Sequence, residues 1–119
     1  MQPGLVILLL VLLVGGAAAS SVGLLGLLGR LKPNRWAGIR TGFTMASDEH
    51  WYAAHRAAGP IMLLGSLPVA AASLAFLPFV LLDKIDGAII IGLAAGSALL
   101  ILTTTLVGAW YGIALAKAK

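Results

Sequence analysis

The stretch that decides the fold is "AGPIMLLGSLPVAAASLAFLPFVLL", residues 58–82, which carries no charged side chain. A bilayer core of about 30 Å is crossed by roughly 20 apolar residues in a helix. Residues 4–28 and 87–116 are also free of charge and long enough to cross. Of the 119 residues, 61% are hydrophobic and 10% are charged, whereas about 25% are charged in soluble domains. The sequence therefore predicts an all-α membrane protein with three transmembrane helices in one domain, residues 1–119.

The two connections between the spans differ greatly in length. Only "DKID", residues 83–86, separates the second span from the third, which predicts a tight antiparallel hairpin. Residues 29–57 connect the first span to the second. The first apolar run exceeds the core of a typical signal peptide, and no Lys or Arg precedes it. We therefore expect it to be a retained anchor.

Lys and Arg residues are unevenly distributed about the spans. Five of the eight lie in the 29–57 loop, two are Lys117 and Lys119, and the hairpin holds Lys84 alone. Cytoplasmic loops of membrane proteins carry an excess of Lys and Arg. We therefore expect a multi-pass protein of the bacterial plasma membrane, with the loop and C-terminus in the cytoplasm and the N-terminus and hairpin outside.

Glycines recur at spacings of four in the third span, at Gly92 and Gly96 and again at Gly108 and Gly112. Small residues let helix backbones approach closely in lipid. They allow packing among the three spans, or packing on a second protein or a second copy. Pro60, at the start of the second span, cannot donate a helical hydrogen bond and predicts a bend or break there.

Ionisable residues are missing from all three apolar runs. Ion pathways and proton relays normally place such residues inside the membrane. A membrane-embedded hydrolase needs a nucleophile and a base. The pattern therefore argues against a self-contained transporter and against a membrane-embedded hydrolase. We expect no enzymatic activity and no cofactor.

The end of the long loop predicts a short cytoplasmic helix. Ser47 is a suitable N-cap, and two acidic residues follow it in the first turn. Asp48, Trp51 and His55 share one helical face, as an acid–base pair or a structural hydrogen bond would need. His50 and His55 lie about 140° apart around the helix, which disfavours a shared metal ion. No metal site is predicted.

Basic and aromatic residues alternate earlier in the loop, at Arg35, Trp36, Arg40 and Phe43. This pattern occurs in nucleic-acid-binding proteins. Beside a membrane span, however, Trp lies at headgroup depth and Arg contacts lipid phosphates. We therefore expect membrane lipids, and no nucleic acid, as partners.

Arg40 lies away from both span ends, between a flexible glycine and a threonine. A folded cap explains this position if Arg40 donates to a carbonyl, to Asp48 or to Glu49, with Trp51 packed beneath it. A structural clamp and a ligand site remain equal interpretations of this arrangement.

The loop resembles the signature of the SdpI-like immunity-protein family. That pattern reads approximately N-x-x-x-G-I-R-T-P-x-T-x-x-S-x-x-x-W-x-x-x-H/N-R-x-x-G, and Gly42 replaces its proline. The three-span layout also fits a minimal member of the family. The residues in matching places are Asn34, Gly38, Ile39, Arg40, Thr41, Thr44, Ser47, Trp51, His55, Arg56 and Gly59.

The family is named for a protein that protects a toxin-producing bacterium against its own secreted peptide toxin. The resemblance implies a non-enzymatic plasma-membrane protein that confers immunity to a peptide toxin or senses one. The glycine-rich spans leave an alternative, a small accessory subunit packed against a larger membrane complex. A third hypothesis, an enzyme or transporter, requires the loop helix to enter the membrane with Asp48, His55 and Arg56.

Overall fold

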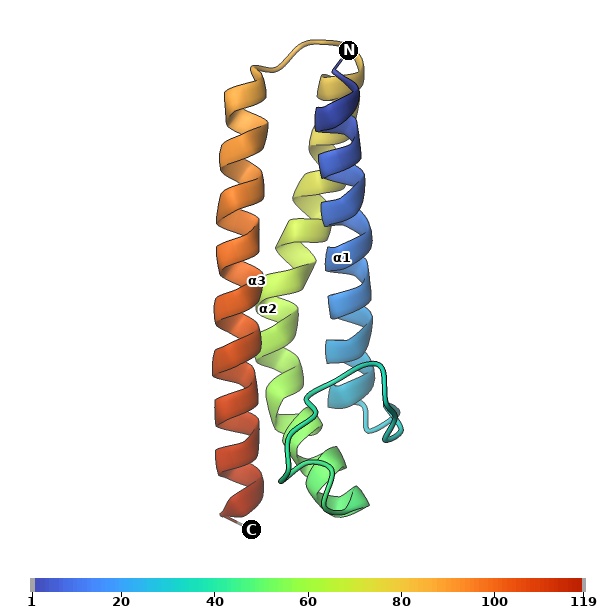
Figure 1. The fold of residues 1–119 in the computed structure, drawn as a ribbon, viewed down its shortest axis with the longest axis vertical. Helices are drawn as coiled ribbons and strands as arrows, with labels where there is room; N and C mark the ends of the chain where they lie inside the picture. Colours follow the sequence, from blue (N-terminus) through green and yellow to red (C-terminus); the bar gives the residue numbers. More distant parts are fainter. Residues whose placement is uncertain (1, 119) are drawn as a thin grey trace.

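The computed structural model describes residues 2–118, which fold into three long α-helices without a strand. The helices are α1 (Pro3–Leu27), α2 (Asp48–Leu81) and α3 (Gly87–Lys117). They form a rod of 52 × 20 × 20 Å, with the hairpin at one end and the long loop at the other (Figure 1). Each helix is long and apolar enough to cross a bilayer. The predicted all-α, three-span fold is confirmed.

The predicted short loop helix is not a separate element. Ser47 is the N-cap, and its Oγ accepts a hydrogen bond of 3.1 Å from the backbone N–H of His50. From there α2 continues without interruption for 34 residues, through Pro60 and the second span. An internal proline costs about 3 kcal/mol. The buried Ala58 and Gly59, directly before Pro60, pack on α3 and α1 respectively, which offsets this cost. The helix therefore curves and does not break (Figure 1).

Small residues allow α1 to pack closely on α2. A Cβ on Gly16 would lie 2.9 Å from the backbone nitrogen of Ala70, and one on Gly23 would lie 3.2 Å from the Gly59 carbonyl oxygen. Between these two contacts, the buried Ser20 hydroxyl donates to the Ser66 hydroxyl over 3.0 Å. Close backbones joined by a polar contact are typical of helix pairs in membranes.

The α2–α3 interface uses the second glycine pair of α3. Gly108 lies against Ala58 and Met62, and Gly112 lies so close to the Ala54 carbonyl that a Cβ has no room. Gly92 and Gly96, by contrast, have open space where a Cβ would stand. Packing within the molecule therefore uses only one of the two predicted glycine faces. Helices α1 and α3 both pack on α2, and they lie on opposite sides of it for most of their length (Figure 1).

The hairpin end is held by apolar packing and a tight turn. Leu9, Val80 and Ile90, one from each helix, form a buried cluster. Asp83 has a left-handed φ of 55° directly after the C-cap of α2, and Asp86 caps α3 by accepting from the Ala88 N–H at 3.0 Å. The predicted hairpin is thus closed by two residues of "DKID".

Candidate functional site

The loop begins with a glycine cap on α1. Gly29 has a φ of +71°, and the N–H groups of Gly29 and Arg30 donate back to the carbonyls of Gly26 and Leu25. This is the pattern of a Schellman cap, which satisfies the last carbonyls of a helix and turns the chain. The following residues are directed out of the α1 axis and around the lower end of the bundle (Figure 1).

Asn34 folds the next turn through its side chain. Its Oδ1 accepts from the N–H groups of Trp36 and Ala37 at 2.8 and 2.7 Å, and its Nδ2 donates to the Lys32 carbonyl. Asparagine side chains replace backbone partners in turns in this way. Asn34 therefore orders an extended loop that has no helix or strand of its own.

His55 fastens the loop to α2 and is only 1% exposed. Its Nε2 accepts a hydrogen bond of 2.7 Å from the N–H of Ile39, and its Nδ1 lies 2.7 Å from the Trp51 carbonyl. Because a carbonyl only accepts, Nδ1 carries the proton and the ring is neutral. Both ring nitrogens are thus used by backbone groups. Asp48, which is exposed, is not their partner, so an Asp48–His55 pair does not form.

His55 lies in the first turns of α2, outside the charge-free span that begins after Arg56. Burial lowers the pKa of His55 below its ordinary value, and the hydrogen bond to the Trp51 carbonyl opposes this change. Protonation of Nε2 would also remove the acceptor of the Ile39 N–H. Desolvation and geometry therefore both favour the neutral ring.

Trp51 fills the space beneath the loop and is fully buried. Its Nε1 donates to the Leu31 carbonyl over 2.8 Å, and its ring lies 4.2 Å from that of His55, measured between centroids. Gly38 passes directly over both rings with a φ of +109°, and a Cβ there would lie 2.6 Å from His55 Nε2. Only glycine suits this position, for its φ and for its lack of a side chain.

Thr41 and Thr44 close the following turn. The buried Thr44 hydroxyl donates to the Ile39 carbonyl over 2.7 Å and accepts from the Thr41 N–H over 2.9 Å. The Thr41 hydroxyl accepts from the Thr44 N–H over 3.2 Å. The turn leads directly to Ser47, the cap of α2. Each of these polar groups therefore serves the backbone of the loop.

Glycines at the end of α1 and in α2 allow α1 to pack against this assembly. Gly26 lies against the backbone and Cβ of His55, and Gly59 lies against Gly23 and Leu27. The loop, the first turns of α2 and the last turns of α1 are therefore packed as one unit. We call this unit, built on Asn34, Gly38, Thr44, Trp51 and His55, the loop clamp.

Two matching residues stand outside the loop clamp. Arg40 and Arg56 are exposed, and within residues 2–118 neither side chain forms a hydrogen bond or an ion pair. The predicted contacts of Arg40 with Asp48, Glu49 or a carbonyl are therefore wrong, and Trp51 packs beneath Gly38 instead. Ile39 is buried with its N–H bonded to His55, whereas the next residue, Arg40, is exposed.

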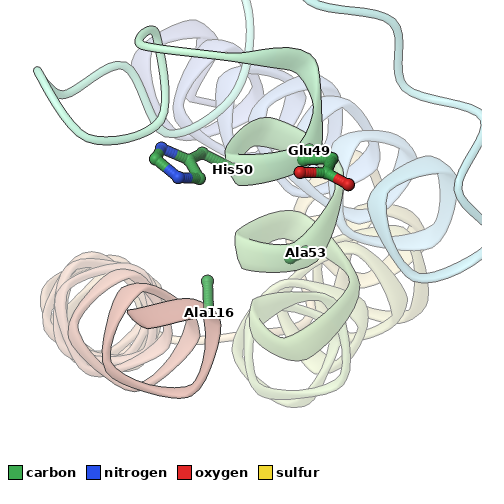
Figure 2. A pocket seen from close by; sticks show the side chains of 4 residues that line it. All are labelled: Glu49, His50, Ala53 and Ala116. Atoms are coloured by element: carbon green, nitrogen blue, oxygen red, sulfur yellow. The ribbon is translucent and has the colours of Figure 1, made fainter. Parts of the chain in front are cut away.

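Sequence reasoning missed a second aromatic contact, between the loop and α3. Phe43 stacks on His50 with centroids 4.1 Å apart, and the Lys117 ammonium lies 5.4 Å from the Phe43 centroid. Beside it, Glu49, His50, Ala53 and Ala116 line a hollow of about 320 Å³ between α2 and α3 (Figure 2). Phe43 lies in the loop and His50 lies in α2, seven residues later. Helical periodicity does not extend across the start of α2, so it could not predict this contact.

Within residues 2–118, no three His, Cys, Asp or Glu side chains lie where they would hold one metal ion. His50 and His55 point to different partners, Phe43 and Ile39. The two histidine side chains therefore join the loop to α2 through hydrogen bonds to backbone groups.

The comparisons with known proteins agree with the loop signature. No curated protein and no solved structure matches the chain. A family model described as the SdpI/YfhL protein family matches residues 30–116, which include the whole loop clamp except α1. Because this match covers most of the chain and contains the signature residues, the protein belongs to the SdpI/YfhL family.

Proposed function

We propose that this protein is a non-enzymatic membrane protein that protects a bacterium against a membrane-active peptide toxin or senses such a peptide. The observation that carries the proposal is that the buried polar side chains of the signature form hydrogen bonds with the protein backbone. The side chains of Asn34, Thr44, Trp51 and His55 are bonded to backbone groups. They offer no free base or nucleophile, and they suit a protein that acts by holding a shape and binding.

The proposed orientation places the loop clamp in the cytoplasm and the hairpin outside. Six of the cations described by the structure lie at the loop end, and Lys84 alone lies at the hairpin end. The excess of Lys and Arg favours the cytoplasm for the loop end. A secreted peptide would then reach the hairpin and the outer halves of the helices first, and the loop clamp would hold α1 and α2 in register from inside.

The experiment is deletion of the gene and complementation with the full chain in the source bacterium. We expect deletion to sensitise cells to a peptide toxin that the bacterium itself secretes, and we expect the wild-type chain to restore resistance. Arg40→Ala should fail to restore resistance. Its abundance in the membrane should be unchanged, because the exposed Arg40 side chain forms no bond within residues 2–118. Arg35→Ala, at an exposed loop arginine outside the signature, is the matched control for loss of one exposed cation. Equal sensitivity of the deletion strain to all its endogenous peptides would refute the proposal.

A second candidate function is an accessory subunit of a larger membrane complex. It is favoured by the unused glycine pair, Gly92 and Gly96, which faces open space on α3. A neighbouring helix would fit there through close backbone contact. This function predicts co-purification in mild detergent with one partner at fixed stoichiometry, lost in Gly96→Leu and retained in Ala95→Leu. A monodisperse 12.2 kDa chain in detergent would contradict it.

A further inference from the structure

The loop end of the rod carries most of the cationic side chains that the structure describes. Within residues 2–118, none of these side chains forms an ion pair, and the only carboxylates described at the same end are Asp48 and Glu49. All six cations are exposed. We call this set the cationic rim, and it consists of Arg30, Lys32, Arg35, Arg40, Arg56 and Lys117.

The cationic rim lies directly beside the apolar length of the helices. Arg30 follows the end of α1 by three residues, Arg56 precedes the charge-free part of α2, and Lys117 ends α3. The loop between them wraps around the lower end of the bundle instead of extending away from it (Figure 1). The charges are therefore held near the depth at which apolar side chains give way to polar ones.

Trp36 marks that depth. Its side chain is 90% exposed, the largest exposed fraction of any large hydrophobic residue described. The Asn34 turn fixes its backbone between Arg35 and Ala37, so it is presented by an ordered segment. Trp side chains prefer the membrane–water interface, where the ring is apolar and the N–H is wet. A soluble acidic partner would not require an exposed indole beside the spans.

The arginine content of the cationic rim favours phosphate groups as its ligand. Arginine presents a planar fork of donors that matches phosphate oxygens, and four of the six rim residues are arginine. A leaflet rich in anionic lipid attracts each nearby cation by about 1 kcal/mol, a roughly fivefold preference. The loop clamp fixes the backbone beforehand, so less ordering is needed on binding.

We propose that the cationic rim and Trp36 form a binding surface for the phosphate headgroups of anionic lipids, which seats the loop clamp on the membrane. This surface is independent of any peptide toxin. It gives the unpaired Arg40 and Arg56 a ligand that the rest of the fold does not supply. It also places the loop on the bilayer surface, not below it in the cytosol.

The experiment measures quenching of Trp36 by brominated lipids. The full chain carries Trp110→Phe, because Trp110 is also exposed and Trp51 is buried. It is reconstituted in vesicles of phosphatidylcholine with phosphatidylglycerol, and the bromine is placed on one lipid or the other at equal mole fraction. We expect stronger quenching when phosphatidylglycerol carries the bromine, and we expect salt to reduce the difference.

Charge variants identify the side chains responsible. Arg35→Gln with Arg40→Gln should lower the ratio of the two quenching constants about twofold or more, whereas the corresponding Lys variants should retain most of it. Lys84→Gln, at the other end of the rod, should leave the ratio unchanged. Equal quenching by both lipids in the parent chain would overturn the proposal. So would a ratio that stays unchanged when both arginines are removed. An unquenched Trp36 would overturn it as well, because the loop would then face solvent.

Discussion

The two ends of the rod are held together by different physical interactions. At the hairpin end, Leu9, Val80 and Ile90 make a buried cluster of apolar side chains, one from each helix. At the loop end, buried Trp51, His55 and Thr44 each bond to a backbone group of the loop. Lipid tails can replace an apolar neighbour at little cost, but they offer nothing to a buried N–H or hydroxyl. Structural specificity is therefore concentrated at the loop end.

Truncation of Trp51 tests this difference most strongly. Trp51→Ala removes a fully buried ring and leaves the Leu31 carbonyl without its donor. We expect a loss of about 3–5 kcal/mol in the free energy of unfolding. Reversible unfolding of the purified chain in mixed detergent micelles measures it. Trp51→Phe keeps most of the volume and should lose only about 1–3 kcal/mol. Equal losses in the two variants would show that packing contributes little to the loop clamp.

The second prediction concerns the backbone of the loop. Gly38→Ala places a methyl group against His55 and Trp51 at a φ of +109°, so both sterics and backbone strain oppose it. We expect a loss of about 2–3 kcal/mol in the same unfolding assay. Gly42→Ala is the matched control, because Gly42 has open space around it and no left-handed φ. A similar loss in both variants would contradict the close approach of Gly38.

Leu9→Ala sharpens the comparison from the other end of the rod. Leu9 is 1% exposed, yet its neighbours are all apolar. We expect a loss of about 1–2 kcal/mol, below the range for buried leucines in water, since lipid substitutes for part of the lost packing. The measurement is again unfolding in micelles. A loss as large as that of Trp51→Ala would remove the distinction between the two ends.

Sequence reasoning predicted the spans, the hairpin, the Ser47 cap and the family signature, because each depends on local pattern. It did not predict which glycine pair of α3 would be used. Gly108 and Gly92 carry the same local signal, and only the course of α3 along α2 separates them. The bond from the Ile39 N–H to His55 was also missed. It joins a loop without regular structure to a helix 16 residues later, and no periodicity connects such positions.

The role assigned to Arg40 failed for a related reason. Sequence proximity to Asp48 and Glu49 suggested an ion pair, but the loop backbone directs Ile39 inward and Arg40 outward. At Pro60 the sequence left a bend and a break open, and packing on two neighbouring helices decided for the bend. Local rules therefore predicted the spans and the caps, and tertiary contacts decided which loop residues are buried.

The fourth prediction is a pH dependence of the loop end. The pKa of His55 is lowered in the folded state, so below its ordinary value of 6.5 the unfolded chain binds a proton that the folded chain does not. Stability should therefore be fully present above pH 6.5 and decrease as pH falls from 6.5 through the lowered pKa of His55. Melting temperatures in detergent between pH 8 and pH 5 measure it. His50→Gln controls for the second histidine, and a decrease that persists in His55→Gln would assign the effect elsewhere.

The smallest expected effect is at the two unpaired arginines, Arg40 and Arg56. Neither bonds within residues 2–118, so Arg40→Gln and Arg56→Gln should leave the melting temperature unchanged in a neutral detergent free of anionic lipid. Lys84→Gln should behave in the same way. If the melting temperature then rises on addition of phosphatidylglycerol in the parent chain and rises less in the arginine variants, these residues act on a ligand. A lower melting temperature already in neutral detergent would instead make them part of the loop clamp, contrary to their exposure.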